Sequence, residues 1–104
     1  MLYYICSPYR GATKEEVEKH IEYAKELTRT VLMKGFSAVT PHLYITNCLN
    51  DSKPEERKPG LAASLEILKR CDVVFVGQKF GISEGMVAEI KEAEKLGIPV
   101  FYRD

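Results

Sequence analysis

The feature that most constrains the fold is a run of β-branched and aromatic residues at 72–77 (DVVFVG). A strand of this kind is buried on both faces, which is typical of the centre of a parallel sheet with helices on either side. Shorter apolar stretches at 2–6 (LYYIC), 36–39 (FSAV) and 97–102 (GIPVFY) predict further strands. The chain therefore indicates a small sheet of about four strands.

Helices are expected between these strands. The first opens at Thr13, which forms a T-x-x-E capping-box pattern with Glu16, and ends near Gly35. Two more are expected over 60–70 and 83–96. Apolar residues recur at three- and four-residue steps, which predicts the faces that pack against the sheet. The residues expected to face inward are Val17, Ile21, Ala24, Leu27, Val31 and Leu32, then Leu61, Leu65 and Leu68, then Val87, Ile90 and Ala93.

A polar connection of roughly twenty residues, at 41–60, separates the second strand from the next helix. Only 43–49 within it has a pattern that could form a helical turn or two. Loops of this length inside a compact domain are uncommon, and they tend to be functional lids or disordered segments. We therefore expect a long loop over the site.

The order of these elements predicts an α/β fold. Right-handed crossovers between parallel strands place helices on both faces, giving a small doubly wound, flavodoxin/Rossmann-like three-layer sandwich. The expected strand order is 2-1-3-4. At 104 residues, the chain has the size of one domain, covering 1–104.

Composition excludes several function classes. Fifteen basic and fifteen acidic residues cancel, so neither a nucleic acid polymer nor an anionic membrane is an expected partner. No apolar run approaches the ~20 residues of a membrane span, and the N-terminus is too short for a signal peptide, so a cytoplasmic location is expected. The three cysteines, Cys6, Cys48 and Cys71, suggest neither a disulfide framework nor a zinc site, and no metal or cofactor is expected.

The ligand site is expected where the strand order reverses. In open parallel sheets, ligands bind beyond the carboxyl ends of the strands at this switch point. For the order 2-1-3-4, the point lies between the strands at 2–6 and 72–77. The segments that leave them, 7–11 (SPYRG) and 78–86 (QKFGISEGM), are polar and contain glycine. Topology and composition therefore indicate one location.

The residues at each end of the segment 83–89 (SEGMVAE) can be interpreted in two ways, as a ligand site or as ordinary helix structure. Ser83 can cap the helix or bind a ligand, and Gly85 would let an anion approach the amides, although Glu84 would repel a phosphate. A capped surface helix with an incidental glycine explains this end equally well. At the other end, Glu89 is either a functional carboxylate, with a raised pKa or a nucleophilic role, or a partner in helix-surface salt bridges.

The segment 7–11 and the residues after the second strand supply further candidates. Arg10 could bind a phosphate through its planar fork, or be an exposed turn arginine. Tyr9 could stack on a base or cover the helix, and His42 could bind a base or be structural. The P-loop and G-x-G-x-x-G patterns do not occur, which argues against a P-loop ATPase and a dinucleotide fold of the usual kind.

Taken together, the sequences at 4–11 (YICSPYRG), 71–77 (CDVVFVG) and 83–89 (SEGMVAE) resemble the nucleoside 2-deoxyribosyltransferase-like superfamily, most closely its small phage and prokaryotic branch. Its members include nucleoside deoxyribosyltransferases and nucleoside 5′-monophosphate N-glycosidases. The resemblance implies that Glu89 is the catalytic nucleophile. The substrate-binding residues that follow from the motifs are Ser7, Tyr9, Arg10, Gly11, His42, Ser83, Gly85 and Met86.

The resemblance further implies an N-glycosidase or 2-deoxyribosyltransferase that acts on a nucleoside or (deoxy)nucleoside 5′-monophosphate. The family's assisting aspartate corresponds to a position near Ser64. The carboxylates that could replace it are Asp51, Glu56 and Glu66. A homo-oligomer is implied, because a neighbouring subunit completes the site in larger relatives. The alternative is a nucleotide-binding or sensing module that uses the same pocket without cleavage.

Overall fold

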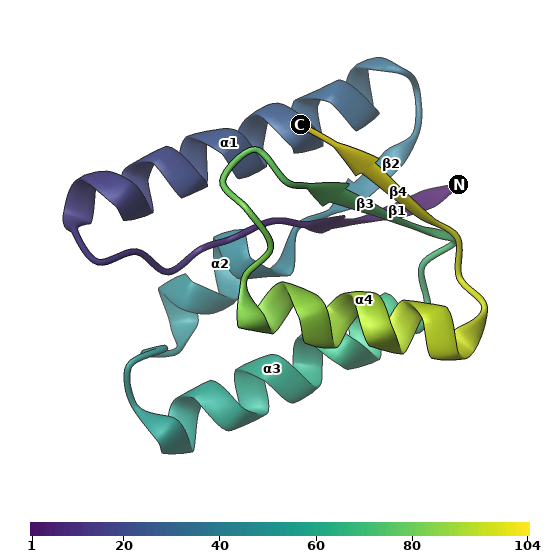
Figure 1. Cartoon of the computed structure of the whole chain (residues 1–104). Helices are drawn as coiled ribbons and strands as arrows, with labels where there is room; N and C mark the ends of the chain where they lie inside the picture. Colours follow the sequence, from purple (N-terminus) through teal and green to yellow (C-terminus); the bar gives the residue numbers. More distant parts are fainter.

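The computed structural model describes all of residues 1–104 and contains a four-stranded parallel sheet (Figure 1). Its strands are β1 (Leu2–Cys6), β2 (Ser37–Val39), β3 (Val73–Gly77) and β4 (Val100–Arg103). They lie in the order β2-β1-β3-β4, and every neighbouring pair is parallel. The predicted fold class and strand order are therefore confirmed.

The two central strands end side by side. In the register between β1 and β3, Tyr4 lies opposite Val74 and Cys6 opposite Val76. Four of the five residues of β3 are buried, as expected for a strand covered on both faces. The segments that leave β1 and β3 therefore begin at one edge of the sheet, where the sequence placed the ligand site.

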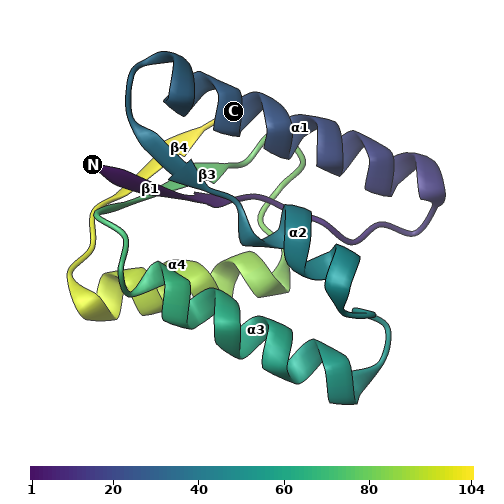
Figure 2. The ribbon, with the colours of Figure 1, turned by 180° about the vertical axis from the view of Figure 1, so that it is seen from behind.

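Four helices enclose the sheet: α1 (Lys14–Met33), α2 (Pro41–Cys48), α3 (Pro54–Leu68) and α4 (Glu84–Leu96). α1 lies alone against one face, while α3 and α4 run side by side against the other (Figures 1 and 2). α2 leads from the end of β2 towards the start of α3 (Figure 2). None of the helices is long and apolar enough to cross a membrane.

The alternation of side chains along β1 divides the core into two layers. Ile5 packs with Tyr23, Leu27 and Val31 on the α1 face. Tyr4 and Cys6 point to the opposite face, where they belong to a cluster with side chains of β3, α3 and α4. Two polar atoms of β1, the Tyr4 hydroxyl and the Cys6 thiol, are thereby directed towards α4.

The prediction of a long loop at 41–60 is wrong. α2 and the first half of α3 occupy most of it, and only 49–53 remains between them. Each helix has a proline in its first turn, Pro41 and Pro54, where the fixed φ angle favours helix and the missing N–H has no intrahelical partner to lose. α3 also tolerates Pro59 in its interior. The helical turns allowed at 43–49 correspond to α2, whereas polar composition and prolines concealed the first half of α3 from the sequence pattern.

Three residues expected in the core are exposed. Leu32, near the end of α1, is 52% exposed, and Leu61 and Val87 are 44% and 38% exposed. On α4 the predicted inward residues Ile90 and Ala93 are buried, and Met86 takes the place of Val87 in the buried face. On α3 only Leu68 of the expected residues is buried. Which side chains near a helix end are buried depends on tertiary contacts, and sequence periodicity alone does not specify them.

Candidate functional site

Glu89 is the centre of a hydrogen-bonded group beneath α4. Its Oε2 accepts a hydrogen bond from the hydroxyl of Tyr4, and its Oε1 lies 3.5 Å from the Cys6 thiol, which donates to it. Tyr4 and Cys6 are fully buried, whereas Glu89 is half-buried. Both carboxylate oxygens are therefore fixed by β1, and the group sits where the sheet meets α4.

Burial controls the protonation of this group. It raises the pKa of Glu89 to about 6, although the hydrogen bonds from Tyr4 and Cys6 act in the opposite direction. Burial also raises the pKa of Tyr4, and the charge of Glu89 raises it further. The pKa of Cys6 is raised for the same two reasons. At neutral pH, Tyr4 and Cys6 thus keep their protons and donate to an ionised carboxylate, which can act as a nucleophile or a base.

Ser64 extends this group onto α3. Its hydroxyl donates to the carbonyl of Gly60 at 3.1 Å. The nearby Ser64 side chain also lowers the pKa of Tyr4, against the larger rise caused by burial and by Glu89. Ser64, near which the resemblance implies an assisting aspartate, therefore lies close to the Glu89 group and carries a hydroxyl in place of a carboxylate.

A second polar contact joins the end of β1 to the first turn of α2. The Oγ of Ser7 and the Nε2 of His42 are 3.0 Å apart. Ser7 is buried, and burial lowers the pKa of His42 to about 4, so the imidazole is neutral at pH 7. A neutral ring can donate from one nitrogen and accept at the other, so His42 can form hydrogen bonds without adding charge.

Arg10 lies in an open groove of about 570 Å³ between the β1–α1 turn and the α2–α3 connection. Its Nε is 3.3 Å from Oδ2 of Asp51, and Arg57 approaches the other oxygen of the same carboxylate at 3.5 Å. Tyr9 and Gly11 line the same groove. A Cβ at Gly11 would meet the Cβ of Glu16 at 2.6 Å, so only glycine fits this turn against the start of α1.

The N-terminus of α4 combines a cap, an open glycine and a packing residue. The Oγ of Ser83 accepts from the backbone N–H of Met86 at 3.3 Å, as predicted for a cap. At Gly85, no atom lies within 4 Å of where a side chain would begin, so the space there is open. Met86 belongs to the core, and its side chain is 1% exposed. This buried side chain offers no surface to a ligand.

The three carboxylates suggested as partners of Glu89 all bind elsewhere. Asp51 bridges two arginines, as described above. Glu56 accepts from the backbone N–H of Asn50 at 2.9 Å and lies 4.0 Å from Lys53. Glu66 is exposed and pairs with Arg70 at 3.2 Å and Lys69 at 3.7 Å, just beyond the end of α3. The structure therefore brings none of them to Glu89.

Sequence reasoning missed the roles of Tyr4, Cys6 and Arg57. The roles of Tyr4 and Cys6 could have been predicted by combining the two-residue alternation of the strand β1 with the helical repeat of α4. Alternation along β1 places Tyr4 and Cys6 on one face, and the inward residues of α4 surround Glu89. Arg57 gave no signal, because its contact with Asp51 depends on the helical start of α3.

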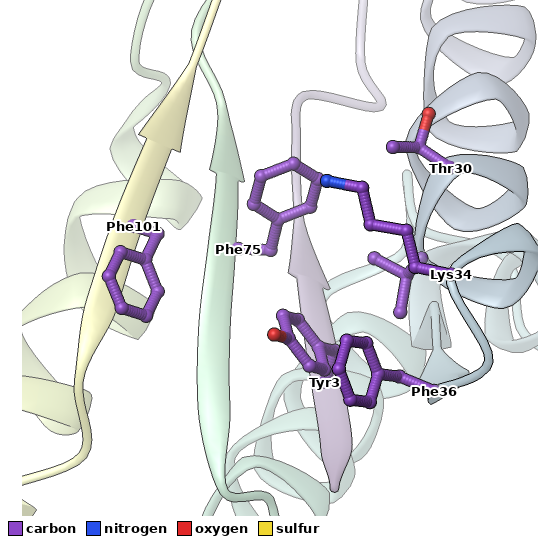
Figure 3. Close-up of a pocket in the computed structure, with 7 residues that line it drawn as sticks. Tyr3, Thr30, Lys34, Phe36, Phe75 and Phe101 are labelled. Atoms are coloured by element: carbon purple, nitrogen blue, oxygen red, sulfur yellow. The ribbon is translucent and has the colours of Figure 1, made fainter.

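A different pocket, of about 240 Å³, lies on the α1 face of the sheet (Figure 3). Tyr3 and Phe36 stack at its base with ring centroids 5.3 Å apart, and Lys34 extends beside the ring of Phe75. Phe101 of β4 forms the far side. This pocket is separated from Glu89 by the sheet, so it is not part of the same site.

No group of three or more His, Cys, Asp or Glu side chains that could hold a metal ion occurs in the structure.

Comparison with known proteins agrees with the fold. The structure is similar to that of a 2-deoxyribosyltransferase from the psychrotolerant bacterium Bacillus psychrosaccharolyticus, with a TM-score of 0.69 and 24% sequence identity. The similarity covers 98% of this chain and 71% of the other. The comparison with curated proteins gave no match. A family model described as a domain of unknown function (DUF7768) matches residues 1–103, so the chain belongs to this family.

Proposed function

We propose that this protein is an N-glycosidase or 2-deoxyribosyltransferase that acts on a nucleoside or (deoxy)nucleoside 5′-monophosphate, with Glu89 as the nucleophile. The observation that carries the proposal is the half-buried carboxylate of Glu89, with one oxygen bound by Tyr4 and the other by Cys6. It lies in a fold that resembles that of a 2-deoxyribosyltransferase. A carboxylate fixed in this way is suited to attack at one point of a bound sugar.

In the proposed reaction, an oxygen of Glu89 attacks the anomeric carbon of the sugar. The glycosidic C–N bond breaks, its electron pair leaves with the base, and the base takes up a proton. A glycosyl ester of Glu89 remains. Water then attacks the same carbon in a hydrolase, or a second base does so in a transferase, and the carboxylate is released. Both steps proceed through an oxocarbenium-like transition state.

We propose the following roles for the remaining candidate residues. Arg10, with Ser83 and Gly85 at the start of α4, would bind the 5′-phosphate. The Ser7–His42 pair would form hydrogen bonds with the base or sugar, with the imidazole neutral at pH 7. Tyr9 would stack on the base. We assign Met86 to the core rather than to the ligand, because its side chain is buried.

The test is release of free base. Each nucleoside and each 5′-monophosphate is incubated with the protein and analysed by chromatography. Glu89→Gln should abolish the release, because an amide is a poor nucleophile. Glu94→Gln, which removes an exposed carboxylate from the same helix, should leave it intact. No release from any substrate with the unmodified protein would refute the enzymatic proposal.

The second candidate function is a module that binds a nucleotide without cleaving it. The occupation of Asp51, Glu56 and Glu66 by other partners favours it, because no carboxylate is left to assist Glu89. This function predicts saturable binding in calorimetry without base release. Arg10→Ala should then weaken binding by about 1.5–3 kcal/mol, the range for a charge-assisted hydrogen bond. Binding that survives this change would contradict the assignment of the phosphate site.

We also propose that the chain forms a homo-oligomer, as the resemblance implies. Large apolar side chains are exposed on both faces of the edge strand β4, with Phe101 at 56% and Tyr102 at 51%. Exposed apolar groups on an unpaired strand edge are typical of a surface that associates. Light scattering after gel filtration should give a mass above that of one chain. A monomer at all concentrations would contradict the proposal.

A further inference from the structure

One carboxylate, Asp51, lies between two arginines at the edge of the groove described above. Building on the proposed role of Arg10, we propose that Arg10 and Arg57 together bind the phosphate of a nucleoside 5′-monophosphate. Asp51 occupies this site in the free protein and is displaced when the ligand binds. Arg57 is thus a second phosphate-binding residue. The Asp51 carboxylate competes with the ligand for the two arginines, so ligands of low charge bind less well than phosphates.

The geometry of the contact is that of a bound anion. Asp51 Oδ2 lies 3.3 Å from Nε of Arg10, and Oδ1 lies 3.5 Å from Nε of Arg57. Each oxygen of the carboxylate therefore meets a different guanidinium group. A phosphate monoester also presents several charged oxygens to planar donors, and arginine is the residue best suited to bind it. The carboxylate shows where the phosphate would bind.

The charges and donors around Asp51 are only partly satisfied. Two arginines and one carboxylate leave a net positive charge, which a doubly charged phosphate would neutralise better than Asp51 does. The Nε of Arg57 is buried and makes no hydrogen bond, although it is close to Asp51. A buried donor without an acceptor is costly, so an anion with more oxygens is favoured there. The other carboxylate that lines the groove, Glu56, accepts a hydrogen bond from the backbone N–H of Asn50.

Asp51 can be displaced because both ion pairs that hold it are partly exposed to solvent. The side chains of Arg10, Arg57 and Asp51 are 62%, 37% and 28% exposed. Ion pairs between exposed groups contribute little, so competition by Asp51 should reduce affinity about fivefold at most. Asp51 belongs to the short connection 49–53, which links α2 to α3. This segment can therefore move away without unfolding either helix.

Calorimetry with matched ligands tests the proposal. The ligands are the four 2′-deoxynucleoside 5′-monophosphates, the corresponding nucleosides and inorganic phosphate. Arg57→Gln should weaken binding of the monophosphates about tenfold to a hundredfold, the range for loss of a charge-assisted hydrogen bond, and should leave nucleoside binding unchanged. Asp51→Asn should strengthen binding of the monophosphates and of phosphate about two- to fivefold. Arg29→Gln, which removes an exposed arginine from α1, is the control and should change neither.

The outcomes separate this proposal from the proposed function. Monophosphate binding that depends on Arg57, without any base release, supports the phosphate site and contradicts the enzyme. Equal binding of monophosphates to the Arg57→Gln variant and the unmodified protein overturns the phosphate site, whether or not base is released. If no deoxynucleotide binds, inorganic phosphate decides, and phosphate binding that is absent or independent of Arg57 overturns the proposal. If Arg57→Gln does not fold, Arg57→Lys and Asp51→Asn are measured instead, and unchanged phosphate affinity in both overturns it.

Discussion

Replacing Glu89 by glutamine should make the protein more stable at neutral pH while it removes the proposed nucleophile. Burial raises the pKa of Glu89 from 4.5 to about 6. The folded protein therefore binds this proton more tightly than the unfolded chain does. Stability from this group is fully present below pH 4.5 and is lost as the pH rises through 6.

The magnitude follows from the same values. A rise from 4.5 to about 6 corresponds to about 2 kcal/mol of unfolding free energy, which is lost between acidic and neutral pH. Glutamine is nearly isosteric and neutral at every pH, and its carbonyl oxygen can still accept the hydrogen bond from Tyr4. The stability of Glu89→Gln relative to the unmodified protein should therefore increase by about 2 kcal/mol between pH 4 and pH 8.

Urea unfolding at several pH values measures this difference directly. Glu94→Gln, on the exposed side of the same helix, controls for the loss of a charge from α4. The increase should appear only for the change at Glu89. A stability difference for Glu89→Gln that stays constant from pH 4 to pH 8, or that grows towards acidic pH, would refute the view that burial dominates the electrostatics of this site.

Four further predictions follow from individual contacts. Tyr4→Phe removes a hydrogen bond that favours ionised Glu89, so the acidic limb of any pH–rate profile should move to higher pH, and an unmoved limb would contradict this. The ring of His42 should titrate near pH 4 in NMR spectra, with stability that is present above pH 6.5 and lost as the pH falls towards 4. Cys48 is exposed and the other two thiols are buried, so Cys48→Ser should eliminate rapid labelling by a thiol reagent; persistent rapid labelling would show that a buried thiol is accessible. Gly77→Ala should destabilise the protein by about 1–3 kcal/mol in urea unfolding, because a methyl group there would overlap buried side chains of α1.

The sequence predicted the sheet because local patterns and global topology agree in this chain. The apolar run at 73–77 can only be buried on both faces, and the short connections allow one handedness of crossover. The two caps, Thr13 and Ser83, were also predicted, because capping depends on residues only three positions apart. These features do not require knowledge of distant contacts.

The segment 41–60 shows where this reasoning failed. Its polar composition suggested a loop with at most a helical turn or two at 43–49, yet α2 and α3 occupy most of it. The two helices pack against each other, and such packing stabilises helices whose own apolar pattern is weak. The consequence for the site is direct, since the helical start of α3 places Arg57 beside Asp51.

The sequence by itself determined the α/β topology and the edge of the sheet at which the motifs gather. Both follow from periodicity and spacing, which are local properties of the chain, whereas the choice of Glu89 also depended on the resemblance of the motifs to a known superfamily. Only the tertiary structure decided what surrounds Glu89. The Tyr4 hydroxyl lies 85 positions away in sequence, and its contact with Glu89 depends on the packing of α4 across β1. The same packing partly buries the carboxylate, and this burial, rather than any neighbouring residue in the sequence, raises its pKa.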